Sequence, residues 1–221
     1  MDRPFRILSL SGGGIRGIFQ SIFLEKISKE LPAPLYQNFD LICGTSTGAI
    51  VGLAIANGID LKLISNLYKD KGELIFKKQN FSGFQQGPTY NQENLKKELQ
   101  NVFENKQLKD SHTKVLIASA SISNFDHKVF TNFKTHTNQD SNLSTVDVIL
   151  SSTAAPTYFI PHQPSAQERH YVDGGLWANT PSSLAILFAN KYLKVPISDI
   201  NLISIGAGDF PNGATIEHLK K

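Results

Sequence analysis

The sequence predicts an α/β fold with a largely parallel sheet, in one domain of 221 residues. Short apolar segments of strand length alternate with longer segments whose apolar residues recur at helical spacing. Glycine-rich turns lie where strand-like segments pass into helical ones. With 40% hydrophobic and 19% charged residues, a chain of this length is typical of a globular domain with a substantial core.

The first half of the chain predicts strand, helix, strand and helix in turn. Residues 5–10 alternate in polarity and then meet a glycine cluster, which predicts a strand and a turn. From Gly17 onward apolar residues recur at helical spacing until a pair of prolines ends the helix. Residues 39–43 are a short apolar run typical of a buried strand, and the small apolar segment from Gly48 to Gly58 predicts a buried helix.

The second half continues this alternation. Helices are expected after Asp60 and Asn91, which are both good N-caps, and after Pro181. A further helix is expected from Ser144, because Ser-Thr-Val-Asp resembles a capping box. Strands are expected at residues 115–120, 128–133, 171–172 and 202–205.

Composition and charge narrow the function classes. The formal net charge is +3, and the basic residues are mostly lysines scattered along the chain, which does not favour nucleic acid as a partner and suits anionic lipid. A single cysteine, Cys43, excludes an internal disulfide and a Cys-rich zinc site. No apolar stretch is long enough to span a bilayer and no signal peptide is visible, so a cytoplasmic protein is expected.

The first glycine-rich turn, Ser11-Gly12-Gly13-Gly14-Ile15-Arg16-Gly17, connects a predicted strand to a predicted helix. Unshielded backbone N–H groups and the helix N-terminus suit an anion, which could be a phosphate or a tetrahedral oxyanion. The glycine spacing also matches a dinucleotide fingerprint, but no acidic residue ends the second predicted strand to bind a ribose. A phosphate-loop ATPase is disfavoured because no Gly-Lys-Ser/Thr follows.

The second turn, Gly44-Thr45-Ser46-Thr47-Gly48, places a serine between a buried strand and a helix of small residues. Such a turn exposes the serine at the end of the sheet, and the helix N-terminus favours negative charge there. We therefore expect Ser46 to be a nucleophile, with a structural turn and capping serine as the alternative. Cys43, a rival nucleophile, ends a buried strand without a basic neighbour, which is typical of a core residue.

The third turn, Asp173-Gly174-Gly175, ends a short predicted strand and supplies a candidate base for Ser46. The usual order Ser, Asp, His would require a later histidine, and only His218, close to the C-terminus, qualifies. The economical interpretation is a Ser46–Asp173 dyad without histidine. Because an ordinary Asp has a pKa of about 4, this dyad requires a partly dry site that raises the pKa of Asp173. It also requires an oxyanion held by the amides of the first turn.

Together the three turns resemble the motifs of the patatin-like phospholipases. Residues 152–159 (Ser-Thr-Ala-Ala-Pro-Thr-Tyr-Phe) and 177–181 (Trp-Ala-Asn-Thr-Pro) are also similar to family segments, so the resemblance covers about residues 5–209. It implies a patatin-like three-layer sandwich with a central, mostly parallel sheet flanked by helices, in one domain over residues 1–221. It assigns Ser46 as nucleophile and Asp173 as base, an oxyanion loop of Gly12, Gly13, Gly14 and Arg16, and supporting motif positions Gly44, Gly48, Gly174 and Gly175.

The resemblance implies a lipid acyl hydrolase of the phospholipase A type, which cleaves fatty-acyl esters of membrane phospholipids through an acyl-enzyme without cofactor or metal. The chain is similar to bacterial relatives that a cyclic nucleotide switches on in antiphage defence. That similarity implies a cyclic-nucleotide activator and a cytoplasmic protein that contacts the inner membrane peripherally when active. Two alternatives stay open: an esterase of small soluble esters, and a non-catalytic module that binds a nucleotide or lipid through the Gly12–Gly17 turn.

Three further expectations carry alternatives. Residues 74–84 combine aromatic residues with lysines, which fits a membrane-contacting flap or a loop that packs on the core. Pro156, Tyr158 and Phe159 fit the lining of an acyl pocket or a plain turn on the sheet. Family members commonly continue beyond the strand at residues 202–206, so the chain is a minimal form or a part truncated at the C-terminus, and its oligomeric state is open.

Overall fold

A computed structural model describes residues 3–79, 87–135 and 140–208. The strands in these ranges are β1 (Phe5–Leu10), β2 (Leu41–Thr45), β3 (Lys114–Ser121), β4 (Asp126–Thr131), β5 (Tyr171–Asp173) and β6 (Ile200–Ile205). The α-helices are α1 (Gly17–Glu30), α2 (Leu35–Asn38), α3 (Thr47–Ala56), α4 (Leu61–Ile75), α5 (Gln92–Phe103), α6 (Thr145–Thr153), α7 (Gly175–Ala178) and α8 (Ser182–Leu193). The 3₁₀ turns are η1 (Gly14–Arg16), η2 (Leu108–Asp110), η3 (Asp140–Asn142) and η4 (Ile197–Asp199).

The strands form one sheet in the order β4-β3-β2-β1-β6, and β5 joins it by pairing with β3. β1 is parallel to both β2 and β6, and β2 is parallel to β3, whereas β4 and β5 run antiparallel to β3. The predicted α/β fold with a mostly parallel sheet is therefore confirmed.

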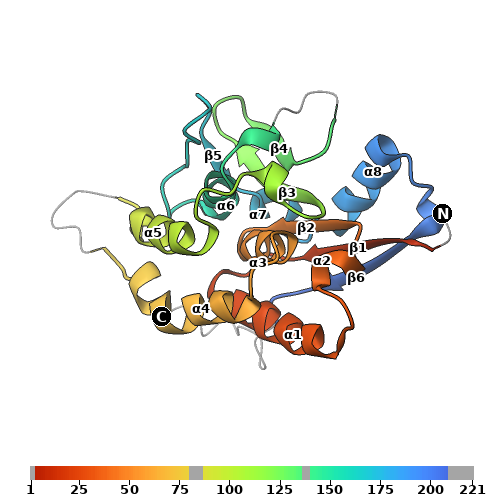
Figure 1. The fold of residues 1–221 in the computed structure, drawn as a ribbon. Helices are drawn as coiled ribbons and strands as arrows, with labels where there is room; N and C mark the ends of the chain where they lie inside the picture. Colours follow the sequence, from red (N-terminus) through yellow and green to blue (C-terminus); the bar gives the residue numbers. More distant parts are fainter. Residues whose placement is uncertain (1–2, 80–86, 136–139, 209–221) are drawn as a thin grey trace, which may run out of the picture.

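Helices cover both faces of the sheet and make three layers. One core cluster joins the sheet to α1, α3, α4, α5 and α6, and a second, smaller cluster joins the other face to α8. Figure 1 shows α8 on the far side of the strands from α1 and α4. The strands β2 and β3 carry apolar side chains toward both layers, as expected of strands covered on both faces.

The helix α3 is the centre of the larger cluster. All ten of its residues are buried, because the helix is apolar on every side and lies between the sheet and the other helices. It begins directly after β2, so its N-terminus is fixed at the carboxyl end of the central strands. The predicted buried helix is confirmed, and it positions the serine turn.

The edge of β3 changes partner along its length. β2 pairs with β3 up to the match of Thr45 with Ala118, and β5 then pairs from Ser119 onward, opposite Asp173. β4 occupies the other edge of β3 over the same residues, so β2 and β5 share a single edge end to end. The residue that follows Thr45 is therefore aimed at the end of β5.

The structure corrects the capping box expected at Ser144. The helix α6 begins where predicted, but the Ser144 side chain makes no capping hydrogen bond. The Asp147 carboxylate instead accepts hydrogen bonds from Ser165 and is paired with His162 at 2.9 Å. A partner distant in the sequence therefore competes successfully with the local backbone for this carboxylate.

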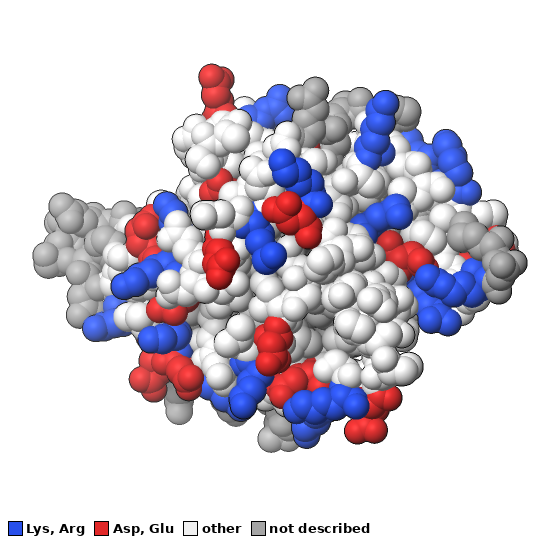
Figure 2. Space-filling view, viewed as in Figure 1, with Lys and Arg blue, Asp and Glu red and all other residues white. Residues whose placement is uncertain are grey.

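The helices of the described ranges include no candidate membrane span, and the face seen in Figure 2 carries charges of both signs. Within the described ranges, no helix is both long enough and apolar enough to cross a bilayer. Figure 2 shows lysine and arginine side chains interspersed with aspartate and glutamate over the face in view.

The close approach of α3 to the sheet makes a testable prediction at Gly48. A Cβ there would lie 2.2 Å from the Leu10 carbonyl oxygen, a backbone atom that cannot move without separating α3 from β1. We expect Gly48→Ala to lower the free energy of unfolding by about 1–3 kcal/mol. The matched control is Gly72→Ala in α4, whose Cβ would meet only the Ile15 side chain at 3.4 Å. At Gly72, alanine should raise the free energy of unfolding by up to about 1 kcal/mol, because it has a higher helix propensity than glycine. Both variants are measured by denaturant unfolding, and equal effects would contradict the steric explanation for Gly48.

Candidate active site

Ser46 lies on the sharp turn between β2 and α3, with φ 54° and ψ −124°. A non-glycine residue in this region carries strain of about 1–3 kcal/mol, which the surrounding structure must offset. The turn places Ser46 as the N-cap residue of α3 and on the wall of a mainly apolar pocket. The strain thus accompanies a side chain that faces open space at the positive end of a buried helix.

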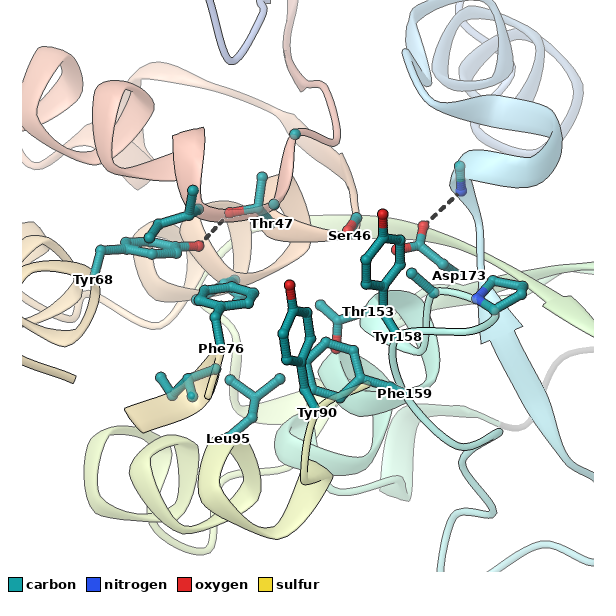
Figure 3. A pocket seen from close by; sticks show the side chains of 18 of the residues that line it. Ser46, Thr47, Tyr68, Phe76, Tyr90, Leu95, Thr153, Tyr158, Phe159 and Asp173 are labelled. Atoms are coloured by element: carbon teal, nitrogen blue, oxygen red, sulfur yellow. Dashed lines mark hydrogen bonds between the residues drawn. The ribbon is translucent and has the colours of Figure 1, made fainter. Parts of the chain in front are cut away.

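Asp173 meets Ser46 because β5 takes over the edge of β3 where β2 ends. The Ser46 side chain faces the Asp173 carboxylate and interacts with it. The Gly175 N–H donates to Asp173 Oδ1 at 2.7 Å, and the Asp173 N–H donates to the Ala154 carbonyl at 3.0 Å. Figure 3 shows the two side chains side by side at one end of the pocket.

The pKa of the Asp173 carboxyl is raised above its ordinary value of 3.8. Burial is the largest cause, because a dry site disfavours the charged form. The interaction with Ser46 and the hydrogen bond from the Gly175 N–H act in the opposite direction and are outweighed. A carboxylate with a raised pKa is a better proton acceptor for a serine hydroxyl than an ordinary Asp.

The first glycine turn closes over the same end of the pocket. The Gly12 N–H donates to the Asn179 carbonyl at 2.9 Å, so this amide is already engaged. Gly13 and Gly14 border the pocket beside Ser46, and within the described residues their N–H groups donate to no other part of the chain. Arg16 donates to the Gly13 carbonyl at 3.4 Å and to the Gly208 carbonyl at 3.1 Å, so it braces the turn from outside.

The supporting glycines Gly44 and Gly174 lie where two backbone segments approach each other closely. A Cβ on Gly44 would lie 2.4 Å from the Gly48 carbonyl oxygen, and one on Gly174 would lie 2.4 Å from the Ala118 carbonyl oxygen. These distances are too short for any side chain, so both turns require glycine for packing. The sequence places the glycines correctly, but the atoms they contact are visible only in the fold.

The pocket has a volume of about 510 Å³ and is apolar apart from the end that holds Ser46 and Asp173. One wall is aromatic, with ring centroids of Phe76 and Tyr90 5.5 Å apart and those of Tyr90 and Phe159 5.6 Å apart. The backbone of residues 89–90 pairs with that of residues 157–158, which ties the two halves of this wall together. A long apolar chain ending in a polar carbonyl group matches this lining (Figure 3).

These contacts decide two of the expectations on substrate access. Pro156, Tyr158 and Phe159 do line the pocket. Phe76 and Ile75 pack in the wall and the core, so for them the core alternative to a flap holds, whereas residues 80–86 lie outside the described ranges. The sequence missed Tyr68, Tyr90 and Leu95 as lining residues, because their helical or loop spacing gives no sign of what they face.

The other candidate nucleophile, Cys43, and the histidines of the described ranges lie outside the pocket. Cys43 is fully buried in the α8 cluster, and burial raises the pKa of its thiol to about 12, which disfavours the thiolate nucleophile. No histidine of the described ranges lines the pocket: His162 is paired with Asp147 and His127 stacks on Trp177. His218 lies outside the described residues. No cluster of potential metal ligands occurs in the part of the chain that the structure describes.

Comparison with known proteins agrees with this arrangement. The family model "Patatin-like phospholipase" matches residues 8–186, which include all three glycine turns. A cGAMP-activated phospholipase of Vibrio cholerae serotype O1 is 30% identical over 93% of this chain and 65% of its own length. A cGAMP-activated phospholipase of Escherichia coli strain TW11681 is 31% identical over 93% of this chain and 63% of its own length. A cUMP-AMP-activated phospholipase of Escherichia coli is 29% identical over 95% of this chain and 67% of its own length.

The chain therefore spans 63% to 67% of the length of these relatives. Among solved structures, VipD from Legionella pneumophila has the same fold, with a TM-score of 0.57 at 14% identity over 92% of this chain and 50% of VipD. The family match covers most of the chain and agrees with the sheet, the serine turn and the aspartate turn. The chain belongs to the patatin-like phospholipase family.

Proposed function

We propose that this chain is the catalytic unit of a lipid acyl hydrolase that cleaves fatty-acyl esters of membrane phospholipids. The observation that carries the proposal is that Ser46 and a buried Asp173 face each other at the polar end of an apolar pocket. A pocket of this shape accommodates an acyl chain and brings its ester carbonyl to the serine. Small soluble esters, the alternative substrates, would leave most of this apolar lining without contact.

In the proposed reaction, Ser46 Oγ attacks the ester carbonyl carbon while its proton passes to Asp173. The oxyanion of the tetrahedral intermediate is held by the N–H groups of Gly13 and Gly14, with the loop braced by Arg16. Collapse breaks the ester bond, and the leaving alcohol of the lysophospholipid takes the proton from Asp173. Water then attacks the acyl-enzyme with Asp173 again as base, which releases the fatty acid and restores Ser46.

Two properties of the relatives bear on regulation. The similar phospholipases are named as cGAMP- or cUMP-AMP-activated, and we propose that a cyclic dinucleotide likewise switches on the protein that contains this chain. The proposed setting is a cytoplasmic enzyme of antiphage defence that reaches the inner membrane only when active. The family resemblance supports this setting.

Removing the nucleophile tests the proposed chemistry. Ser46→Ala should reduce fatty-acid release from phospholipid vesicles by about 10⁴-fold or more, because no other group can form the acyl-enzyme. Wild type and variant are compared with and without cGAMP and cUMP-AMP, and the control is Ser198→Ala, an exposed serine of η4 that is bonded only to its neighbour Asp199. Retention of release by Ser46→Ala in any arm would defeat the dyad.

Asp173→Asn should lower turnover by about 10⁴-fold, because the amide cannot accept the proton.

The Asp173→Asn change should also alter the free energy of unfolding in a defined direction. Since the folded-state pKa of Asp173 lies above 3.8, the folded state holds this proton more tightly, and stability falls as pH rises from 3.8 through the folded-state pKa. Denaturant unfolding of wild type and variant between about pH 4 and pH 8 should therefore show the variant as the more stable protein at neutral pH. A less stable variant would show that burial does not dominate at this carboxyl.

Contact with the membrane is proposed through the rim of the pocket. Ile15, Leu176 and Tyr158 line the pocket and are also exposed, so the mouth is apolar. Phe19 and Phe23 extend the surface from Ile15 along α1 at helical spacing, 50% and 41% exposed, with ring centroids 5.8 Å apart. A bilayer that covers this stripe would place its lipids next to the mouth.

Replacing both phenylalanines by serine should lower fatty-acid release from vesicles by about tenfold or more, since each buried ring contributes about 1.5–3 kcal/mol. Neither ring lines the pocket, so hydrolysis of a soluble short-chain ester should be unchanged. The control is the double change Leu187→Ser and Ile197→Ser, at exposed apolar positions in α8 and η4. Equal losses in the two double variants, or an equal loss on the soluble ester, would refute the contact surface.

A further inference from the structure

The strained turn at Ser46 needs a partner that fixes its backbone. The N–H of Ser46 does not point back into β2 or α3 but donates to the hydroxyl of Ser152 at 2.9 Å. Ser152 belongs to α6, a helix more than a hundred residues further along the chain. The nucleophile's own backbone is therefore held by a side chain from another element.

The Ser152 hydroxyl makes two hydrogen bonds, and each uses a different property of the group. It accepts from the Ser46 N–H and donates to the Ala118 carbonyl of β3 at 2.7 Å. Ala118 is the residue opposite Thr45 in the sheet, so it marks the point where β2 ends. One hydroxyl thus joins α6, the serine turn and β3 at the place where the edge of β3 changes partner.

The environment of Ser152 makes the arrangement specific. Its side chain is fully buried, so water does not replace it when it is removed. Only a group that is donor and acceptor at once satisfies the Ser46 N–H and the Ala118 carbonyl together. The neighbouring segment carries the base as well, because the Ala154 carbonyl accepts the Asp173 N–H.

We propose that Ser152 is a positioning residue, which holds the turn so that Ser46 Oγ stays beside the Asp173 carboxylate. The inference rests on the proposed serine chemistry but not on the identity of the lipid. Without the Ser152 hydroxyl, the Ser46 N–H loses its acceptor and the turn relaxes toward an unstrained backbone. Ser46 Oγ then moves away from the attack position, although every group that reacts is still present.

Ser151 provides a matched comparison for the effect of burial alone. It is the adjacent residue of α6, it is also fully buried, and its hydroxyl donates to a backbone carbonyl, that of Asp147 in the same helix. Ser151→Ala removes the same atom from the same helix but leaves the Ser46 N–H bonded. A difference between the two variants isolates the contact with Ser46.

The experiment measures wild type, Ser152→Ala, Ser152→Cys and Ser151→Ala at a temperature where thermal unfolding shows all of them folded. The Cys variant nearly keeps the side-chain volume but replaces the hydroxyl by a thiol, which is only a weak donor and a weak acceptor, so it remains informative if Ser152→Ala fails to fold. A fluorophosphonate probe reports the nucleophilicity of Ser46 directly, and hydrolysis of a soluble ester separates kcat from KM. The probe requires only an activated serine, so wild type that is labelled but releases no fatty acid from lipid would refute the proposed function and leave this inference standing.

We expect both Ser152 variants to lose about 10²-fold in labelling rate and in kcat, with KM unchanged, while Ser151→Ala stays within about threefold of wild type. The acid limb of the pH profile should shift little, because Asp173 stays buried, keeps the hydrogen bond from the Gly175 N–H and loses only the interaction with Ser46. Labelling of the Ser152 variants at the rate of Ser151→Ala, or a loss confined to KM, would overturn the positioning role.

Discussion

The structure depends on one edge of one strand. β3 is paired first with β2 and then with β5, and the site lies at the junction between them. Because β2 must leave the sheet for β5 to enter, the chain turns sharply after Thr45, and the turn residue faces the end of β5. The juxtaposition of Ser46 with Asp173 and the close packing of the glycines are consequences of sharing this edge. The strained backbone of Ser46 has the same cause, since a wider turn after Thr45 would occupy the space that β5 fills.

Two unfavourable features are concentrated at the junction. Ser46 has a backbone conformation that side chains rarely adopt, and Asp173 is a carboxyl in a dry environment. Both are tolerated because the surroundings are rigid: α3 is buried along its whole length, and Ser119 ties α6 to β5 through hydrogen bonds to the Ser151 and Val172 carbonyls. The stability lost at the junction is offset by apolar burial in the layers around it.

The sequence predicted the alternation of elements and the junction's glycine turns, because both are local patterns. It singled out Ser46 from its flanking residues and Asp173 as a candidate base at the end of a short strand, and the family resemblance then implied the same two residues. It did not predict which carbonyl or hydroxyl each turn contacts, since Ser152, Asn179 and Tyr90 reach the site from distant segments. The capping box expected at Ser144 does not form for the same reason, because the Asp147 carboxylate is paired with His162. Local patterns therefore singled out the candidate residues that the fold brings together, whereas the contacts that hold them depend on the tertiary fold.

One short stretch, residues 152–159, contacts Ser46, Asp173 and the pocket. Ser152 accepts from the Ser46 N–H, Ala154 accepts from the Asp173 N–H, and Pro156, Tyr158 and Phe159 line the pocket. A change in the shape of this wall would therefore disturb the contacts that hold Ser46 and Asp173 in place. Leu67, Ile75 and Leu95 lie in α4 and α5, which supply the lining remote from the dyad. Divergence in chain-length preference within such enzymes should therefore accumulate in these two helices, while the stretch after Ser152 stays nearly constant.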